Sequence, residues 1–124
     1  MAQIEVIGNV GKDPELKFIS GAKGDFAVAK FSIADTPREQ KNGEWVEGET
    51  TWYFVNVTGQ LAEAVTDKIT KGNKVIVRGD LRTFEYTKDG EKKSGWEIRA
   101  KFVAIVPTVS KTAKKVEADD AWPF

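Results

Sequence analysis

The sequence predicts a mostly β protein that contains a single helix. Segments of β-branched or alternating apolar residues, typical of strands, fill most of residues 1–106. Turn-forming pairs such as Asn42-Gly43 and Asp89-Gly90 lie between these segments. Residues 59–73 instead show the four-residue apolar spacing of a helix. The fold class is therefore all-β with one helix.

The expected elements follow the chain in order. Strands are expected at "AQIEVIGNV", "DPELKFIS" and "FAVAKFSIAD", then a charged hairpin at "TPREQKNGEWVEGE" and a strand at "TTWYFVNVT". In the helix that follows, Leu61, Val65 and Ile69 form the apolar stripe, and Gly72 is expected to cap the C-terminus. Two long strands at "KVIVRGDLRTFEYTKDG" and "KKSGWEIRAKFVAIV" complete the series.

This order matches a small barrel with a helix inserted before its last two strands. In a five-stranded Greek-key barrel of the OB type, one helix lies between the third and fourth strands. A β-sandwich with one helical plug is the alternative, and the OB-fold is favoured over it. We assign residues 1–107 to this domain, 108–118 to a flexible linker because they are poor in apolar residues, and 119–124 to an acidic tip of a disordered tail.

The composition excludes several classes of function. The chain has no His and no Cys, which rules out the usual zinc sites and His-based triads. The carboxylates Asp13, Glu15, Asp80 and Glu85 are scattered, without the arrangement that a two-metal nuclease needs. No apolar run approaches the ~20 residues that span a membrane. We expect a cytoplasmic protein that is not an enzyme and has no catalytic residue, cofactor or metal.

The net charge is zero, with 19 basic and 19 acidic side chains. Residues 1–107 alone carry 16 of each. A balanced domain lacks the basic excess that is typical of nucleic-acid binding. Any binding of that kind requires the basic groups to be sorted onto one face.

Strand alternation assigns two rings of the strand before the helix to an outward face. In "TTWYFVNVT", Tyr53, Val55 and Val57 form the inward set, which leaves Trp52 and Phe54 outward. A subunit contact for Tyr53 stays open.

The next long strand shows the same pattern. Val75, Val77, Gly79 and Leu81 are expected inside, with Arg82, Phe84 and Tyr86 outside. Rings interleaved with arginine suit single-stranded nucleic acid, because unpaired bases stack on rings while basic groups contact phosphates. A second small core or a subunit interface over these rings is the alternative.

The remaining rings receive different assignments. Trp45 lies in the polar hairpin and is expected to be exposed, so it needs some partner. Trp96 shares its alternation with Ile98 and is expected to be buried, as are Phe18 and Phe31.

Several stretches together resemble a known family. "VIGNVGKDPELKF", "AVAKFSIAD", "GQLAEAVTDKITKGNKVIVRGDLRT" and "DDAWPF" are similar to the bacterial-type single-stranded DNA-binding protein. The charged segment "TPREQKNGEWVEGE" resembles the form found in actinobacteria and their phages. The resemblance covers about Ile4 to Ile105 and the tip. It implies an OB-fold, a homotetramer, and coating of single-stranded DNA in replication, recombination and repair. For a phage-encoded protein it implies the host cytoplasm.

The resemblance also implies roles for individual residues. Trp52 and Tyr86 match rings that stack on bases, Arg82 and Lys71 match basic positions that contact the strand, and Trp45 falls in a loop that commonly carries a DNA-contacting ring. Where the family often has another aromatic, this chain has Thr58. Either Phe54 or Phe84 on the same faces compensates, or the affinity is lower.

The tip is expected to bind proteins. In the family, an acidic tip that ends in Pro-Phe recruits proteins of DNA metabolism. Here the tip consists of Asp119, Asp120, Trp122, Pro123 and Phe124. The acids would pair with basic residues around a pocket that receives the apolar ring. An OB-fold accessory module that acts mainly through protein contacts is the second hypothesis, and it predicts rings buried in an interface.

Overall fold

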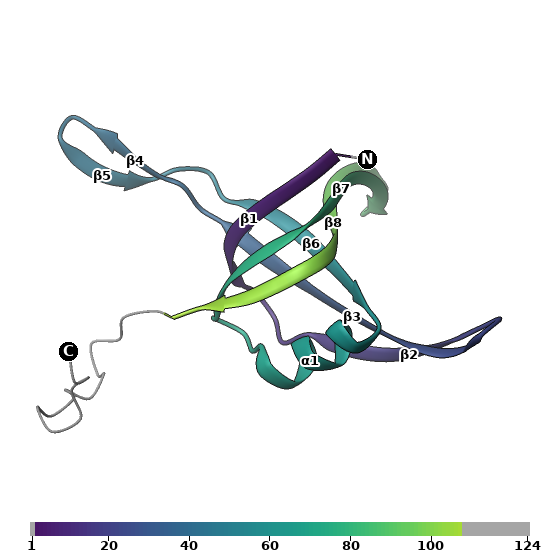
Figure 1. Cartoon of the computed structure of the whole chain (residues 1–124). Helices are drawn as coiled ribbons and strands as arrows, with labels where there is room; N and C mark the ends of the chain where they lie inside the picture. Colours follow the sequence, from purple (N-terminus) through teal and green to yellow (C-terminus); the bar gives the residue numbers. More distant parts are fainter. Residues whose placement is uncertain (1, 108–124) are drawn as a thin grey trace, which may run out of the picture.

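Five strands close on one another to form a barrel in the computed structural model, which describes residues 2–107 (Figure 1). The barrel strands are β1 (Ala2–Val10), β3 (Gly24–Asp35), β6 (Thr51–Thr58), β7 (Lys74–Lys88) and β8 (Glu91–Val106). Their order in the sheet is β1-β7-β8-β6-β3, with β6 and β8 parallel. Asn9 and Val10 of β1 pair with Ile33 and Ala34 of β3, which closes the ring. The predicted OB-fold is confirmed.

The helix α1 (Gln60–Lys68) lies between β6 and β7, the third and fourth strands of the barrel, as predicted. It packs mainly against β3, at one end of the barrel (Figure 1). Its expected stripe holds, because Val65 and Ile69 are buried in the core and Leu61 packs against it.

The predicted cap at Gly72 is wrong. Helix α1 ends at Lys68, and Ile69 already has extended backbone angles of φ −103° and ψ 132°. The side chain of Ile69 is buried in the core, with 3% of its surface exposed. Gly72 lies in the next turn, where its N–H donates to the carbonyl of Val10 at 2.8 Å.

The core consists almost entirely of small and branched apolar side chains. Among residues 2–107, Phe31 is the one aromatic residue that is buried. The buried aliphatic residues are Val6, Val10, Ala27, Val28, Ala29, Ile33, Val55, Val57, Ala62, Val65, Ile69, Val75, Val77 and Ile98. The inward sets expected for β6 and β7 are therefore confirmed, with Tyr53 and Leu81 partly buried against this core.

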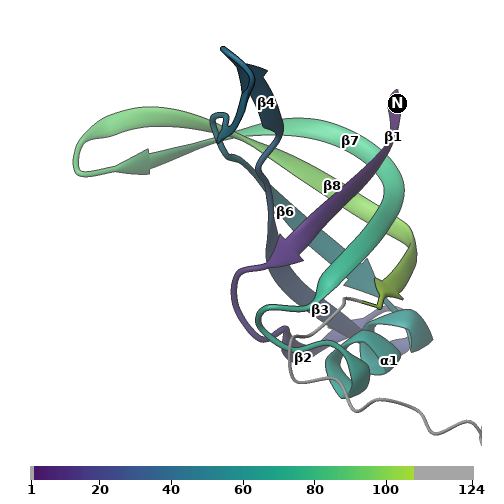
Figure 2. The same ribbon diagram turned by 90° about the vertical axis from the view of Figure 1, so that its left-hand side faces the viewer.

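Three hairpins extend from the barrel within the described residues. The first joins β2 (Glu15–Gly21) to β3, and the second joins β4 (Arg38–Lys41) to β5 (Glu44–Glu47) in a separate sheet. The third is the far part of β7 and β8, which runs past the barrel in Figure 2. The turns at Asn42-Gly43 and Asp89-Gly90 have positive φ at both residues, as their sequences predict.

Two predictions of burial are wrong. Phe18 is 64% exposed and Trp96 is 44% exposed. Both lie on the side that alternation assigns to the core, since Phe18 pairs with buried Ala27 and Trp96 pairs with Tyr53. Phe18 lies on β2, outside the five barrel strands, so no second layer covers its ring. Trp96 lies at the first residue pair between β6 and β8, at the end of the paired region, and its ring is only partly covered there.

No helix among residues 2–107 has the length and apolar character needed to cross a membrane. The same residues contain no group of three or more carboxylates placed to hold a metal ion.

Candidate nucleic-acid interface

The outer face of β6 and β7 carries exposed rings, as alternation predicts. On β6, Trp52 is 49% exposed and Phe54 is 44% exposed, between inward side chains. On β7, Phe84 is half-buried and Tyr86 is exposed. Because β8 lies between β6 and β7 in the sheet, rings on these two strands could meet only by crossing it.

Phe54, Phe84 and Tyr86 do meet across β8 and form a continuous aromatic row. The rings of Phe54 and Phe84 have centroids 5.4 Å apart in an edge-to-face arrangement. Phe84 and Tyr86 follow at 5.7 Å with tilted planes. Both separations lie in the range at which aromatic pairs attract each other.

A glycine on the intervening strand makes this row possible. Gly95 of β8 is the cross-strand partner of Phe84. A Cβ atom at Gly95 would lie 2.7 Å from Cζ of Phe84, closer than carbon atoms approach. The ring therefore lies directly over the Gly95 backbone.

Trp52 is seated in the same way, over Gly11. A Cβ at Gly11 would lie 2.7 Å from Cζ3 of Trp52 and 3.2 Å from the Ser32 hydroxyl. The indole thus rests on the start of the β1–β2 connection and points away from the core.

A groove of about 610 Å³ runs along the aromatic row. Its walls come from the β1–β2 connection and from β2, β3, β6, β7 and β8. The side chains that line it are Lys12, Asp13, Glu15, Lys30, Phe31, Ser32, Phe54, Val55, Asn56, Phe84, Tyr86, Lys88 and Glu97. Three lysines and three carboxylates thus share this groove.

Arg82 lies beside the groove and is paired with one of its acids. Its Nε atom is 3.3 Å from Oε1 of Glu97, and Nε of Arg99 is 3.8 Å from the same oxygen. The Glu97 side chain is 18% exposed, whereas that of Arg82 is 44% exposed. The charge of the predicted arginine is therefore partly offset by a neighbour that the sequence did not reveal.

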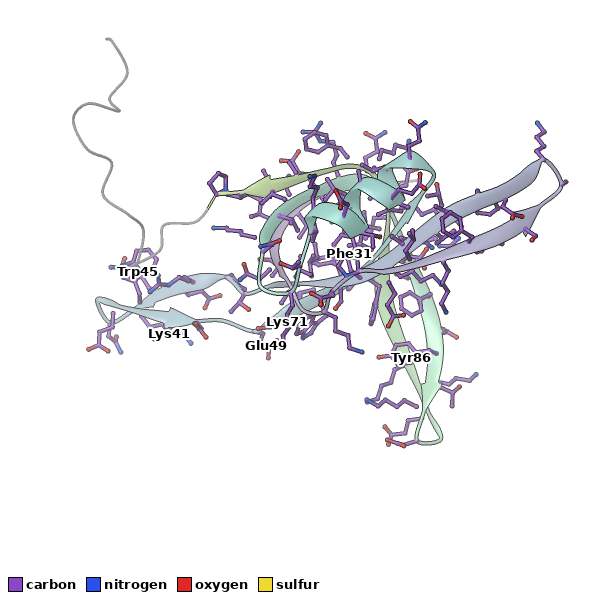
Figure 3. The ribbon with its side chains drawn as sticks, turned by 90° about the horizontal axis from the view of Figure 1, so that it is seen from below. Phe31, Lys41, Trp45, Glu49, Lys71 and Tyr86 are labelled. Atoms are coloured by element: carbon purple, nitrogen blue, oxygen red, sulfur yellow. The ribbon has the colours of Figure 1, made fainter. Side chains whose placement is uncertain are left out.

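Lys71 is held next to the groove without lining it. Its backbone N–H donates to Oδ1 of Asp13 at 2.7 Å. Asp13 lines the groove, so this bond ties the turn after α1 to the groove wall. The Lys71 side chain is exposed (Figure 3).

Trp45 lies apart from the aromatic row. It is 62% exposed on the β4–β5 hairpin, and the guanidinium of Arg38 lies 6.0 Å from its ring centroid. Figure 3 shows Trp45 and Tyr86 on two different hairpins. Of the predicted site residues, the structure brings Phe54, Phe84 and Tyr86 together, with Trp52, Arg82 and Lys71 at the margin.

The sequence analysis did not include any of the three groove lysines, Lys12, Lys30 and Lys88, among the site residues. Lys30 alternates with Ala29 and Phe31, which are buried, so the same rule that placed Trp52 outward would have placed Lys30 outward. Lys12 lies in a connection, where alternation gives no information. The predicted tip residues 119–124 lie outside the described residues.

Comparison with known proteins places this barrel and groove in a family. The model of the single-strand binding protein family matches residues 1–106. This chain belongs to the single-strand binding protein family. Its actinobacterial resemblance is confirmed by similarity to the single-stranded DNA-binding proteins of Corynebacterium glutamicum, at 44% identity over 112 residues, and of Mycolicibacterium smegmatis, at 44% over 100 residues.

These two relatives of the family are longer proteins. The matched regions cover 87% and 77% of this chain but 48% and 58% of the relatives, respectively. The chain therefore spans about half the length of the curated relatives that it matches.

Solved structures of family members share the fold. The small single-stranded DNA-binding protein from Streptomyces coelicolor superposes with a TM-score of 0.74 at 26% identity, over 85% of this chain and 94% of that one. The Plasmodium falciparum protein, solved in complex with single-stranded DNA, superposes with a TM-score of 0.67 at 26% identity, over 86% and 96%.

The glycine beneath the aromatic row gives a direct structural prediction. Gly95→Ala should push Phe84 off the β8 backbone, break its contact with Phe54, and destabilise the fold by about 1–3 kcal/mol through overpacking. Ring-current shifts in NMR spectra report the ring positions, and urea unfolding reports the stability. Ser94→Ala, one position away on the other face, should change neither. Unchanged Phe84 and Tyr86 resonances in Gly95→Ala would contradict this account of the row.

Proposed function

We propose that this protein is a non-enzymatic coat for single-stranded DNA that binds strands without reading a defined sequence. The observation that carries the proposal is the exposed aromatic row of Phe54, Phe84 and Tyr86 along a lysine-containing groove. We place its action in replication, recombination and repair, in the bacterial or phage-infected cytoplasm.

The chemistry of the groove supports this proposal. A base stacked on an aromatic side chain contributes roughly 1–3 kcal/mol, whatever its identity. Lys12, Lys30 and Lys88 line the same groove and can contact phosphates while the bases face the rings. The family relatives carry the name single-stranded DNA-binding protein, and one structural neighbour was solved with single-stranded DNA.

One observation favours the second hypothesis, an accessory module that works through protein contacts. Phe18 is 64% exposed on the β2–β3 hairpin, on the face opposite the outward side of the sheet. A ring there suits a protein partner better than the DNA strand in the groove. This hypothesis predicts DNA binding that is weak and insensitive to salt.

Titration with a long oligo-dT, followed by tryptophan fluorescence at low and high salt, separates the two hypotheses. The coat predicts strong quenching by the single strand, none by a duplex, and weaker binding as salt rises. An absence of quenching and of binding at low salt would reject it.

A pair of tryptophan variants localises the interface. Trp52 and Trp96 are similarly exposed but lie on opposite faces of the sheet. Trp52→Leu should raise the Kd for oligo-dT about fivefold to a hundredfold, the equivalent of one lost stack. Trp96→Leu, the matched control, should stay within about twofold. Anisotropy of labelled oligo-dT measures both, and equal losses in the two variants would contradict the proposed face.

We also propose that four copies assemble into a homotetramer. Among residues 2–107, β1 pairs along one edge only, with β7, apart from Asn9 and Val10, which pair with β3. An open edge of this kind can pair with another strand. The β1 strand of a second copy, related by two-fold symmetry, can be that strand.

A second surface supports a further contact between such dimers. On the outer face of β1, β7 and β8, Ile7, Ile76 and Ala104 stand side by side across the strands. Ile7 is 49% exposed and Phe102, in the next row, is 42% exposed under the Arg78 guanidinium. Burial of these side chains against a second dimer removes apolar surface from water.

Sedimentation tests this assembly. The protein should sediment at four times the chain mass of 13.7 kDa. Ile7→Glu should reduce it to a dimer, because the charge disrupts the apolar face but leaves the β1 edge intact. Phe18→Glu, an equally drastic change at another exposed site, should leave the tetramer. A monomeric natural protein at micromolar concentration would refute the assembly.

The proposed role of the tip in recruiting proteins of DNA metabolism rests on the sequence. Asp119 and Asp120 precede Trp122 and Phe124, a combination that suits a basic-rimmed apolar pocket. Steering by the acids should act on the association rate more than on the affinity.

Peptides test the tip without disturbing the domain. A peptide of residues 113–124 should bind purified bacterial replication or repair enzymes, and Phe124→Ala should weaken that binding at least about tenfold, because one buried ring contributes about 1.5–3 kcal/mol. Val116→Ala, outside the tip, should have no effect. Fluorescence anisotropy measures both, and equal binding by the Phe124→Ala peptide would contradict the role of the ring.

A further inference from the structure

We infer that the interface for single-stranded DNA continues beyond the groove, along the outer face of β2 and β3, to a further base-stacking ring at Phe26. On the way, Lys17 of the same face contacts a phosphate of the strand. The inference rests on the proposed function, because it assumes that single-stranded DNA lies along the aromatic row. It lengthens the path of that strand toward the end of the β2–β3 hairpin.

The pairing of the strands connects Phe26 to the groove through successive rows of one face. Phe54 of β6 pairs with Ser32 of β3, and both line the groove. Every second residue of a strand lies on the same face, so the next outward positions on β3 are Lys30, Val28 and Phe26. Lys30 still lines the groove, and Phe26 lies about 13 Å further along the strand, on the hairpin that leaves the barrel (Figure 1).

The Phe26 ring is exposed and is held against a glycine. It is 42% exposed. A Cβ atom at Gly21 of β2 would lie 3.3 Å from Cε1 and 3.4 Å from Cδ1 of this ring. Phe26 thus lies against the Gly21 backbone, much as Phe84 lies over Gly95 in the aromatic row. The exposed part of a ring that is held in this way is available to a base.

The surface between the groove and Phe26 is a single row across three strands. Lys17 of β2 pairs with Val28 of β3, which pairs with Thr58 of β6. Val28 is only 6% exposed, yet it lies outside the core cluster, so its cover comes from the outer face. In the next row, the cross-strand partner of Phe26 is Ile19, which is 45% exposed. An apolar surface with one basic side chain therefore leads from the groove to the ring.

The charge of this outer face differs from that of the groove, where lysines and carboxylates are equal in number. The outward positions of β2 and β3 between residues 17 and 30 carry Lys17 and Lys30 and no carboxylate. Asp25 is next to Phe26 in the chain and therefore belongs to the opposite face. A strand that leaves the groove along β3 meets basic groups for its phosphates and a ring for a base, the combination that binds unpaired nucleic acid.

Substitutions of Phe26 test the stacking ring. The probe is a labelled oligo-dT of about 16 nucleotides, the upper end of the site size of one OB-fold, titrated by anisotropy with the full chain. Phe26→Leu keeps an apolar side chain but removes the ring, and it should raise the Kd by about fivefold or more. Phe26→Tyr keeps the ring and should stay near the natural Kd. Phe18→Leu is the matched control, because Phe18 is 64% exposed on the opposite face of the same hairpin.

Salt dependence separates the phosphate contact from the stack. For single strands, each neutralised phosphate contributes about 0.7 to the slope of log K against log salt concentration. Lys17→Gln should therefore reduce the slope by about 0.7, whereas Phe26→Leu should weaken binding at every salt concentration and leave the slope unchanged. Lys92→Gln, on the face of the β7–β8 hairpin opposite the aromatic row, should also leave it unchanged.

A measurement on the natural protein makes the test independent of how the variants fold. In a chain with labelled phenylalanine, the ring resonances of Phe26 should shift when oligo-dT is added, and those of Phe18 should not. Unshifted Phe26 resonances, or an unchanged Kd in Phe26→Leu, would overturn the inference while the coat function stands; both are expected if Phe26 and Ile19 contact a protein instead. An unchanged slope in Lys17→Gln would overturn the phosphate contact. Failure of the natural protein to bind oligo-dT would reject the coat function and this inference with it.

Discussion

The narrow interior of the barrel determines where the rings of this protein lie. Apart from Phe31, the buried apolar side chains among residues 2–107 are Val, Ile and Ala, so the closed five-stranded ring has little space for anything larger. Successive side chains of a strand alternate between faces. A strand that commits Val55 and Val57 to the core must therefore present Trp52 and Phe54 outside. The core and the aromatic surface are two consequences of the same constraint.

The same rule explains which parts of the fold the sequence could predict. Alternation and turn pairs correctly indicated the inward sets, both tight turns and the helix before the last two strands. It also placed Phe18 and Trp96 on the correct side, yet both are exposed, because β2 lies outside the five barrel strands and Trp96 lies where the pairing of β6 with β8 begins. The end of the barrel depends on the register between distant strands, which a local pattern does not contain.

The candidate site shows the same division between local and distant information. The outward position of Phe54 and Phe84 follows from their own strands, and their contact depends on Gly95 of a third strand. The pairing of Arg82 with Glu97 likewise follows from the register of β7 and β8. Sequence reasoning could therefore name the rings and the arginine, but not the glycine that seats a ring or the acid that offsets a charge.

The balance of basic and acidic side chains limits how the groove can hold a nucleic-acid strand. The groove contains as many carboxylates as lysines, so it has no basic excess with which to hold phosphates strongly. The carboxylates that line such a groove would repel phosphates placed beside them. They are tolerated if the bases face inward, onto the rings, and the phosphates stay near the lysines. Stacking on the rings would then supply most of the affinity, while the lysines contact the phosphates.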